Sequence, residues 1–376
     1  MAGVAANAAA GTASSQYYLA LIMGQSPADP GVRAALAGLP KIDLHRHLEG
    51  SLRLSSLYEI AQAYDLDLPA DSLNALRPFV QMAGEAHSFR NFLDKFNILR
   101  RFYQSPEIIQ RLAYEAVEDA ARDSVRYLEL RFTPPALAKS RDFPLDEVTD
   151  WVIEAVARAC RAHPKIWVQL IISLNRHEPL ELAEQVTQIA IDRQARGIVG
   201  LDMAGDEVNY PAEPFAGVFG AARAAGLGLV AHAGEWLGAD SVRTAIEVLG
   251  VQRVGHGVRV VEDPGVAALA RERGVVFEVC VTSNLQSGVI DRLSDHPLRQ
   301  MLNLGLLTTL NTDDPAVSDI NLGSEYGAVA SQLGFGLAEI KLMILNAAQG
   351  ALLPPAARAM LVTEFRQSLG LPQTSA

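Results

Sequence analysis

Short apolar segments alternate along this chain with longer stretches in which apolar residues recur at helical spacing. Eight of the short segments favour β-structure and are predicted strands, namely Lys41–His45, Arg126–Phe132, Ile166–Leu174, Ile198–Met203, Leu227–His232, Arg253–His256, Val275–Val281 and Leu306–Asn311. Among the longer stretches, Glu107–Asp123 carries its apolar residues on one side of a predicted helix. Gly274 is placed to end another helix just before the seventh strand.

This alternation, without a break in composition, predicts a single (β/α)8 TIM barrel over residues 32–376. A doubly wound sheet in two domains is the alternative, but neither G-x-G-x-x-G nor a Walker A sequence follows a strand. Residues 1–31 are expected to form a disordered or loosely ordered extension. A helical insertion is predicted at 52–105, after the first strand. Its apolar stripe is expected to pack in the core, with covering of an active site as a secondary role, and consists of Phe89, Phe92, Leu93 and Phe96.

The composition excludes several classes of protein. With 49% hydrophobic and 20% charged residues, the 376-residue chain can bury a substantial core. The net charge of −11 argues against binding to nucleic acid, which normally needs a basic surface. No stretch approaches the ~18 uncharged apolar residues of a transmembrane helix, and a secretory signal is not evident. A cytoplasmic protein without a membrane partner is expected, with Cys160 and Cys280 as reduced thiols.

Polar residues gather at the carboxyl ends of the predicted strands, where the active site of such a barrel lies. His45 and His47 end the first strand and, being two apart, point to the same side. The fifth strand ends in H-A-G-E (232–235), the sixth in His256 between two glycines, and the eighth in N-T-D-D-P (311–315). Scattered core histidines would show no such preference for strand ends.

Four of these residues carry the donor atoms of a metal site. Imidazole nitrogens together with one carboxylate oxygen suit Zn²⁺, one per chain, with iron or cobalt as substitutes. The metal would activate a water in the remaining position. The predicted ligands are His45, His47, His232 and Asp313. The remaining histidines are expected to have surface or capping roles, and they are His87, His163, His177 and His296.

Three further residues are candidate catalytic groups. Glu235, just past the fifth strand, is placed to exchange protons with a substrate. The glycines beside His256 leave room for it to orient or deprotonate the bound water. Asp314 cannot easily share the metal with Asp313, because neighbouring side chains diverge. Asp314 is therefore expected to hydrogen-bond to substrate, with a helix N-cap as the alternative role.

An ordered series of motifs resembles the adenosine deaminase family of amidohydrolase-type barrels. The motifs are K-I-D-L-H-R-H-L-E-G-S at 41–51, V-R-Y-L-E-L-R at 125–131, D-M-A-G-D-E at 202–207, H-A-G-E at 232–235, G-H-G at 255–257, T-S-N at 282–284, H-P-L at 296–298 and N-T-D-D-P at 311–315. One such motif would be weak evidence, whereas the ordered set over most of residues 40–330 is specific. The cytidine-deaminase signature, H-x-E with P-C-x-x-C, is missing.

The resemblance implies a zinc-dependent hydrolase that deaminates adenosine or 2′-deoxyadenosine to the inosine product and ammonia. It implies that Glu235 donates a proton to purine N1, that His256 positions the attacking water, and that the N–H of Gly205 meets purine N3. Asp202 and Glu207 flank that glycine and are expected either to support the site or to be solvated loop acids. Substrate contacts are implied for His47, Glu49, Gly205 and Asp314.

One residue departs from the family pattern. Typical adenosine deaminases have aspartate at the position of Glu49, where it is implied to meet the ribose 5′-hydroxyl. Relatives acting on adenine or aminodeoxyfutalosine are similar to this L-E-G-S form, whereas the segments at 282–288 and 321–326 resemble nucleoside-acting members. Adenosine is the expected substrate. The alternatives are adenine or aminodeoxyfutalosine, a non-purine amidohydrolase substrate, and a non-catalytic binding barrel.

Overall fold

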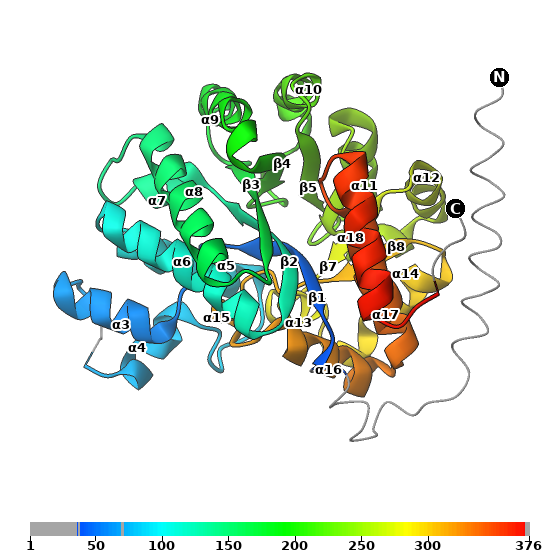
Figure 1. Ribbon diagram of the computed structural model, residues 1–376, viewed down its shortest axis with the longest axis horizontal. Coiled ribbons are helices and arrows are strands. Elements are labelled where there is room, and N and C mark those ends of the chain that lie inside the picture. Colours follow the sequence, from blue (N-terminus) through cyan, green and yellow to red (C-terminus); the bar gives the residue numbers. More distant parts are fainter. Residues whose placement is uncertain (1–35, 37, 69–70, 373–376) are drawn as a thin grey trace.

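The computed structural model describes residues 36, 38–68 and 71–372, and its strands form one closed parallel barrel (Figure 1). The strands follow the order of the chain, and they are β1 (Lys41–His47), β2 (Val125–Phe132), β3 (Trp167–Asn175), β4 (Ile198–Ala204), β5 (Gly228–Ala233), β6 (Arg253–His256), β7 (Val276–Val279) and β8 (Leu307–Leu310). The barrel closes where β1 meets the end of β8. There the N–H of His47 donates to the carbonyl oxygen of Asp313, and the N–H of Asp313 donates to that of His45, both at 2.8 Å.

Helices surround the barrel on its outer side (Figure 1). Those after β2 are α7 (Pro134–Ala138), α8 (Leu145–Ala162), α9 (Leu180–Asp192), α10 (Ala216–Ala224), α11 (Ala239–Thr244), α12 (Pro264–Arg273), α13 (Val281–Gln286), α14 (Leu298–Asn303), α15 (Pro315–Ser318), α16 (Leu322–Leu333), α17 (Leu337–Gly350) and α18 (Pro355–Ser368). The predicted fold class, a single (β/α)8 barrel, is confirmed. The predicted extension at 1–31 lies outside the described residues. Within the described part, no helix is long and apolar enough to cross a membrane.

Local sequence explains where these elements begin and end. All eight predicted strands are present, with ends that differ from the prediction by at most two residues. The predicted helix at 107–123 is α6 (Pro106–Arg122), and the hydroxyl of Ser105 accepts a hydrogen bond from the N–H of Ile108 at its start. Gly274 ends α12 with φ of +65°, a left-handed conformation that glycine adopts without strain. Capping residues therefore account for the start of α6 and the end of α12.

The insertion after β1 is helical, as predicted, and it covers part of the barrel mouth. It comprises α3 (Leu54–Ala63), α4 (Leu73–Val80), α5 (Phe89–Leu99) and the short 3₁₀ helix η1 (Arg100–Phe102). Phe92 is buried, as expected of a core residue, but Phe92 and Phe96 also line the cavity described below. The ring of Phe89 lies 5.6 Å from that of Trp236, which follows β5. The insertion thus covers the cavity, the role expected to be secondary, while Phe92 also packs in the core.

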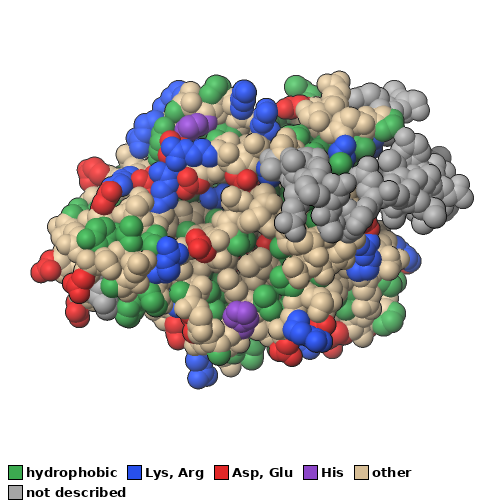
Figure 2. Space-filling view, turned by 90° about the horizontal axis from the view of Figure 1, so that it is seen from below, with side chains coloured by type: hydrophobic (Ala, Val, Ile, Leu, Met, Phe, Trp, Pro, Cys, Tyr) green, Lys and Arg blue, Asp and Glu red, His purple; other side chains and the backbone are tan. Residues whose placement is uncertain are grey.

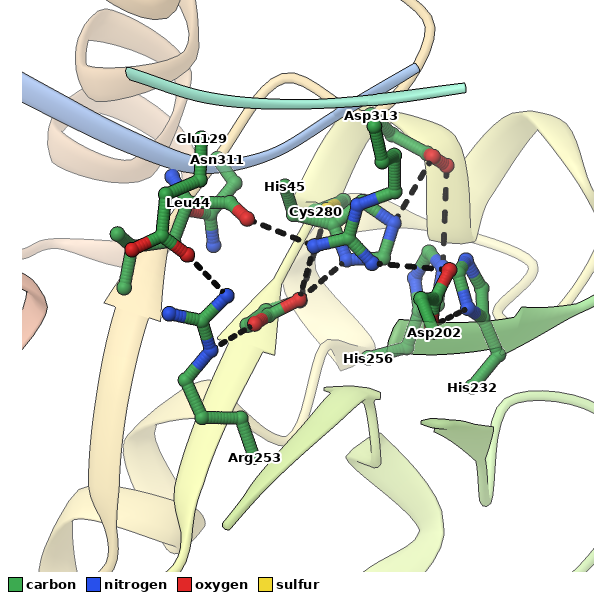
Figure 3. Close-up of polar contacts among 12 residues, drawn as sticks. Leu44, His45, Glu129, Asp202, His232, Arg253, His256, Cys280, Asn311 and Asp313 are labelled. Atoms are coloured by element: carbon green, nitrogen blue, oxygen red, sulfur yellow. Dashed lines mark hydrogen bonds and ion pairs between the residues drawn. The ribbon is translucent and has the colours of Figure 1, made fainter. Parts of the chain in front are cut away.

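Charged side chains fill the inside of the barrel, where branched apolar residues are usual. Glu129 and Arg131 lie two apart on β2 and are both completely buried. Arg253 forms an ion pair with Glu129 at 2.6 Å (Figure 3). Arg253 also pairs with Glu278, and Arg131 pairs with Glu278 at 2.7 Å. Such buried charges persist only when they are paired. The network connects the core of the barrel to the residues at its carboxyl end.

On the face drawn in Figure 2, acidic and basic side chains intermingle, so the charge of that face is of mixed sign. Both cysteines are free, as expected, and burial raises the pKa of the Cys160 thiol and, more strongly, that of Cys280. Neither thiol is therefore primed to ionise.

Candidate active site

Three histidines and an aspartate meet at the carboxyl ends of β1, β5 and β8. They are the four predicted metal ligands, and their ligand atoms all lie within 4.8 Å of one another: His45, His47, His232 and Asp313. The Nε2 atoms of His47 and His232 are 3.2 Å apart, and Oδ1 of Asp313 is 3.2 Å from Nε2 of His45. Two imidazole nitrogens this close need a proton or a cation between them. Burial lowers the pKa of His47 well below its ordinary value, so this ring is neutral and carries a single hydrogen. Either that hydrogen or a cation can lie between the two nitrogens, and the surrounding nitrogen and oxygen donors suit a metal cation.

Two carboxylates orient these histidines from behind (Figure 3). Oε2 of Glu278 lies 2.8 Å from Nδ1 of His45, and Oδ1 of Asp202 lies 3.2 Å from Nδ1 of His232. Burial opposes ionisation of Glu278, but Arg131 lowers the pKa of that carboxyl below its ordinary value. An ionised carboxylate only accepts hydrogen bonds, so each Nδ1 carries the hydrogen and each Nε2 lone pair faces the cluster. Carboxylates commonly support metal-binding histidines in this way, and the nitrogen and oxygen donors fit Zn²⁺.

The backbone at the site is unusual at two strand ends. His256 and Asp313 have φ of +57° and +59°, values that are uncommon outside glycine. Gly255, just before the first of these, has a packing role. A Cβ atom at this position would lie only 2.9 Å from Cε1 of His45. Glycine at this position therefore lets β6 approach the histidine cluster and brings His256 to its edge.

Glu235 lies beside the cluster as a buried carboxyl group. Burial, followed by the charges of Asp313 and Glu207, raises its pKa well above the ordinary value. Its Oε2 is 3.6 Å from Nε2 of His256, and its Oε1 is 3.4 Å from the hydroxyl of Ser287. Burial and these charges thus favour the protonated carboxyl group, the form that can donate a proton.

Asp314 is buried next to Gly50, where a Cβ atom would lie 1.8 Å from its Oδ1. Burial and the adjacent charge of Asp313 raise the pKa of Asp314 well above its ordinary value. The Oδ1 atom has no hydrogen-bond partner among the described residues. Asp314 precedes α15, but its side chain makes no capping hydrogen bond. The N-cap alternative is therefore not supported, and the unpartnered oxygen is free to meet a ligand.

Glu49 presents a similar free oxygen. Its Oε1 accepts a hydrogen bond from the N–H of Thr133 at 2.8 Å, whereas its Oε2 is buried without a partner among the described residues. Burial raises the pKa of Glu49 to about 7. The hydroxyl of Tyr103 and Nε of Arg100 are likewise buried without partners in the described part of the chain. These unpartnered polar atoms can form hydrogen bonds with a ligand and so distinguish one ligand from another.

A cavity of about 250 Å³ opens next to the cluster, a size that suits a small molecule rather than a polymer. The aromatic rings of Phe92 and Phe96 from α5 form part of its wall. Gly205, with φ of +97°, requires glycine for its backbone conformation. All the predicted substrate contacts line this cavity, and they are His47, Glu49, Gly205 and Asp314.

Glu207 holds the loop that carries Glu235. Its carboxylate accepts hydrogen bonds from the hydroxyl of Ser241 and from four successive backbone N–H groups, those of Gly234, Glu235, Trp236 and Leu237, at 2.6 to 3.2 Å. Both Glu207 and Asp202 are buried. The expectation that these acids support the site is confirmed, and the alternative of solvated loop acids is wrong.

Two residues that the sequence did not assign to the site extend it behind His256. Nδ2 of Asn284 lies 3.1 Å from Nδ1 of His256, and Oδ1 of Asn284 lies 3.1 Å from Nε2 of His296. The surface role expected of His296 is wrong, since it is buried. Its capping role is confirmed, because Nδ1 accepts a hydrogen bond from the N–H of Leu298 at the start of α14. The available signal was the pair of motifs T-S-N and H-P-L.

Comparison with known proteins gives consistent results. A family model described as "Adenosine deaminase" matches residues 40–368. A curated adenosine deaminase from Erwinia tasmaniensis is 40% identical over 306 residues, covering 81% of this chain and 91% of that protein. The solved structure of an adenine deaminase from Arthrobacter aurescens superposes with a TM-score of 0.81 at 27% identity, covering 89% of this chain and 100% of that one. An amidohydrolase from Burkholderia ambifaria, solved with bound Zn, superposes with a TM-score of 0.81 at 28% identity over 91% and 94% of the two chains.

The parallel barrel and the cluster at its carboxyl end define a hydrolase of the amidohydrolase type, a class that acts on C–N bonds with the help of a metal. Within that class, the chain belongs to the adenosine deaminase family, because the family model spans most of its length and the curated relative exceeds one third identity.

Proposed function

We propose that this protein is a zinc-dependent deaminase of 6-aminopurine nucleosides, which converts adenosine or 2′-deoxyadenosine to the inosine product and ammonia. One observation carries the proposal: Glu235, a buried carboxyl group whose pKa is raised, lies beside a cluster of three histidines and Asp313. Adding water to a purine carbon requires a proton on the neighbouring ring nitrogen. A carboxyl group kept protonated next to a metal site supplies that proton.

The residues of the cavity divide the work as follows. Zinc held by His45, His47, His232 and Asp313 would supply Lewis-acid activation of the attacking water. Glu235 donates its proton to N1 while the water oxygen bonds to C6. As the C6–N bond breaks and C6=O forms, that oxygen releases its two protons: one passes to the 6-amino group, which leaves as ammonia, and the other restores Glu235. His256 orients the water, and the unpartnered oxygen of Asp314 accepts a hydrogen bond from the reacting edge. The N–H of Gly205 meets N3, and His47 and Glu49 complete the contacts with substrate.

Glu49 is the residue on which the choice between two kinds of substrate depends. The identity to the Erwinia adenosine deaminase supports adenosine. The free Oε2 of Glu49 supports the alternative, adenine or aminodeoxyfutalosine, because the longer side chain reaches further into the cavity than the aspartate typical of adenosine deaminases. A non-purine substrate is less well supported, since it would not need the proton of Glu235. The cytoplasmic location inferred from the sequence stays a prediction.

A substrate panel tests the proposal. The ultraviolet shift from amine to oxo purine is followed with adenosine, 2′-deoxyadenosine, adenine and aminodeoxyfutalosine, together with zinc content by elemental analysis. We expect one zinc per chain and the highest kcat/KM with adenosine. Turnover of adenine alone would overturn the nucleoside assignment. The variant Glu49→Asp should raise kcat/KM for adenosine relative to adenine, and an unchanged ratio would remove Glu49 from substrate selection.

A further inference from the structure

Behind the cavity, three side chains and one backbone group form a chain of hydrogen bonds that ends at His256. From the inside outward these are His256, Asn284, His296 and the N–H of Leu298, and each link is 3.1 Å long. All three side chains are buried, with at most 5% exposed. They lie outside the candidate metal ligands, and nothing in the proposed reaction requires Asn284 or His296 to touch substrate.

The backbone N–H determines the direction of every bond in this chain. A peptide N–H can only donate, so Nδ1 of His296 accepts from Leu298. Burial lowers the pKa of His296 to about 3, so the ring is neutral and its one hydrogen is on Nε2. That hydrogen is donated to Oδ1 of Asn284. The amide Nδ2 of Asn284 must then point the other way and donate to Nδ1 of His256.

The hydrogen bond from Asn284 determines which ring nitrogen of His256 carries the hydrogen. Since Nδ1 accepts a hydrogen bond, the neutral ring carries its hydrogen on Nε2. This Nε2 faces the reacting groups, 3.6 Å from Oε2 of Glu235 and 3.8 Å from Oδ2 of Asp313. A nitrogen that already bears a hydrogen has no lone pair with which to accept another proton.

We propose that Asn284 and His296 are positioning residues that hold His256 as its Nε2–H tautomer, so that His256 orients the attacking water by donating a hydrogen bond and does not act as a base. The kinetic part of this proposal rests on the proposed deaminase function, whereas the tautomer does not. The sequence left two roles open for His256, orienting the water or deprotonating it, and the proposal assigns the first.

The tautomer can be observed directly in the zinc-loaded protein. Histidine labelled with ¹⁵N distinguishes protonated from unprotonated ring nitrogens by chemical shift, and the His256 signals are identified by their loss in His256→Gln. We expect unprotonated Nδ1 and protonated Nε2 for His256. A hydrogen on Nδ1 in the wild-type protein would overturn the proposal.

Asn284→Asp reverses the polarity of one link while preserving the shape of the side chain. A carboxylate can accept from both histidines, so Nδ1 of His256 should gain a hydrogen. We expect kcat to fall on the order of 10–100-fold, as for other lost outer partners, with KM within about twofold because Asn284 lies behind His256. If Nδ1 gains the hydrogen and kcat is unchanged or higher, His256 acts as a base and the proposal is wrong.

Two controls separate positioning from stability. Asn346→Asp makes the same change in another buried asparagine, one that donates to the carbonyl oxygen of Thr308 away from the cavity. It should leave the His256 signals and kcat unchanged. His296→Gln can still donate an amide N–H to Asn284 and should retain most activity, whereas His296→Leu should not. Equal losses in these two variants would contradict the positioning role. An Nε2–H signal in a protein that deaminates no purine would instead refute the proposed function alone.

Discussion

Nδ1 of His45 lies 2.8 Å from Oε2 of Glu278, although the two residues are 233 positions apart in the chain. The contact joins the candidate metal cluster to the charged interior of the barrel, because Glu278 also pairs with Arg131 and Arg253. The carboxylate keeps the hydrogen of His45 on Nδ1 and turns its Nε2 toward Asp313. The inside of the barrel thus orients a residue at its mouth.

Glu278→Gln should weaken zinc binding. The neutral amide accepts a hydrogen bond less strongly and removes one of the two carboxylates that pair with Arg131, so we expect a zinc Kd raised on the order of 10–100-fold. Competition with a chromophoric chelator measures this Kd. Glu129→Gln is the matched control, because Glu129 belongs to the same buried network and pairs with Arg253 instead of a histidine. Equal zinc affinity in the Glu278 variant and the wild type would contradict the orienting role.

Glu235→Gln should retain zinc and lose activity. The amide has nearly the shape of the carboxyl group but cannot transfer a proton, so kcat should fall on the order of 10²–10⁴-fold. Turnover by ultraviolet absorbance and zinc by elemental analysis are measured on the same sample. Glu262→Gln, at a half-exposed acid, provides the control. An active, zinc-loaded Glu235 variant would show that the acid has been assigned to the wrong residue.

Glu207→Gln should loosen the loop at 234–237. A neutral amide oxygen accepts fewer and weaker hydrogen bonds than the carboxylate that now receives five donors. We expect faster amide hydrogen exchange in this loop and a lower kcat, because Glu235 is on the loop. Glu213 is an exposed acid at a surface hollow that Glu207 also borders, and Glu213→Gln should change neither the exchange nor kcat. Unchanged exchange in the Glu207 variant would show that other contacts hold the loop.

Glu325 should make stability depend on pH. Burial raises its pKa from 4.5 to about 7, while the N–H of Thr282 donates to it at 2.8 Å. The folded state therefore binds the proton more tightly than the unfolded state. Its stabilising contribution is present below the unfolded pKa and is lost as the pH rises toward the folded one. Relative to Glu325→Gln, the wild-type free energy of unfolding should fall on the order of 3 kcal/mol from about pH 4.5 to 7.5. Urea denaturation at several pH values tests this difference, and parallel curves would contradict it.

Much of the barrel could be predicted because its signals are local. Each strand is an apolar run of few residues, and α6 and α12 carry their own capping residues, Ser105 and Gly274. The predicted metal ligands also follow from position, since parallel strands bring their carboxyl ends to the same side. By contrast, covering of the site could be given only as a secondary role of the insertion, because an apolar stripe does not reveal that α5 lines a cavity as well as the core.

The sequence by itself determined the order of strands and the polar residues that end them, since both depend on periodicity and neighbouring residues. Only the tertiary structure decided how those residues are oriented. The contacts of Glu278 with His45, of Glu207 with residues 234–237, and of Asn284 with His256 join distant segments. No local pattern encodes them, because they exist only once the barrel has closed and each buried polar group has found the partner that compensates its lost hydration.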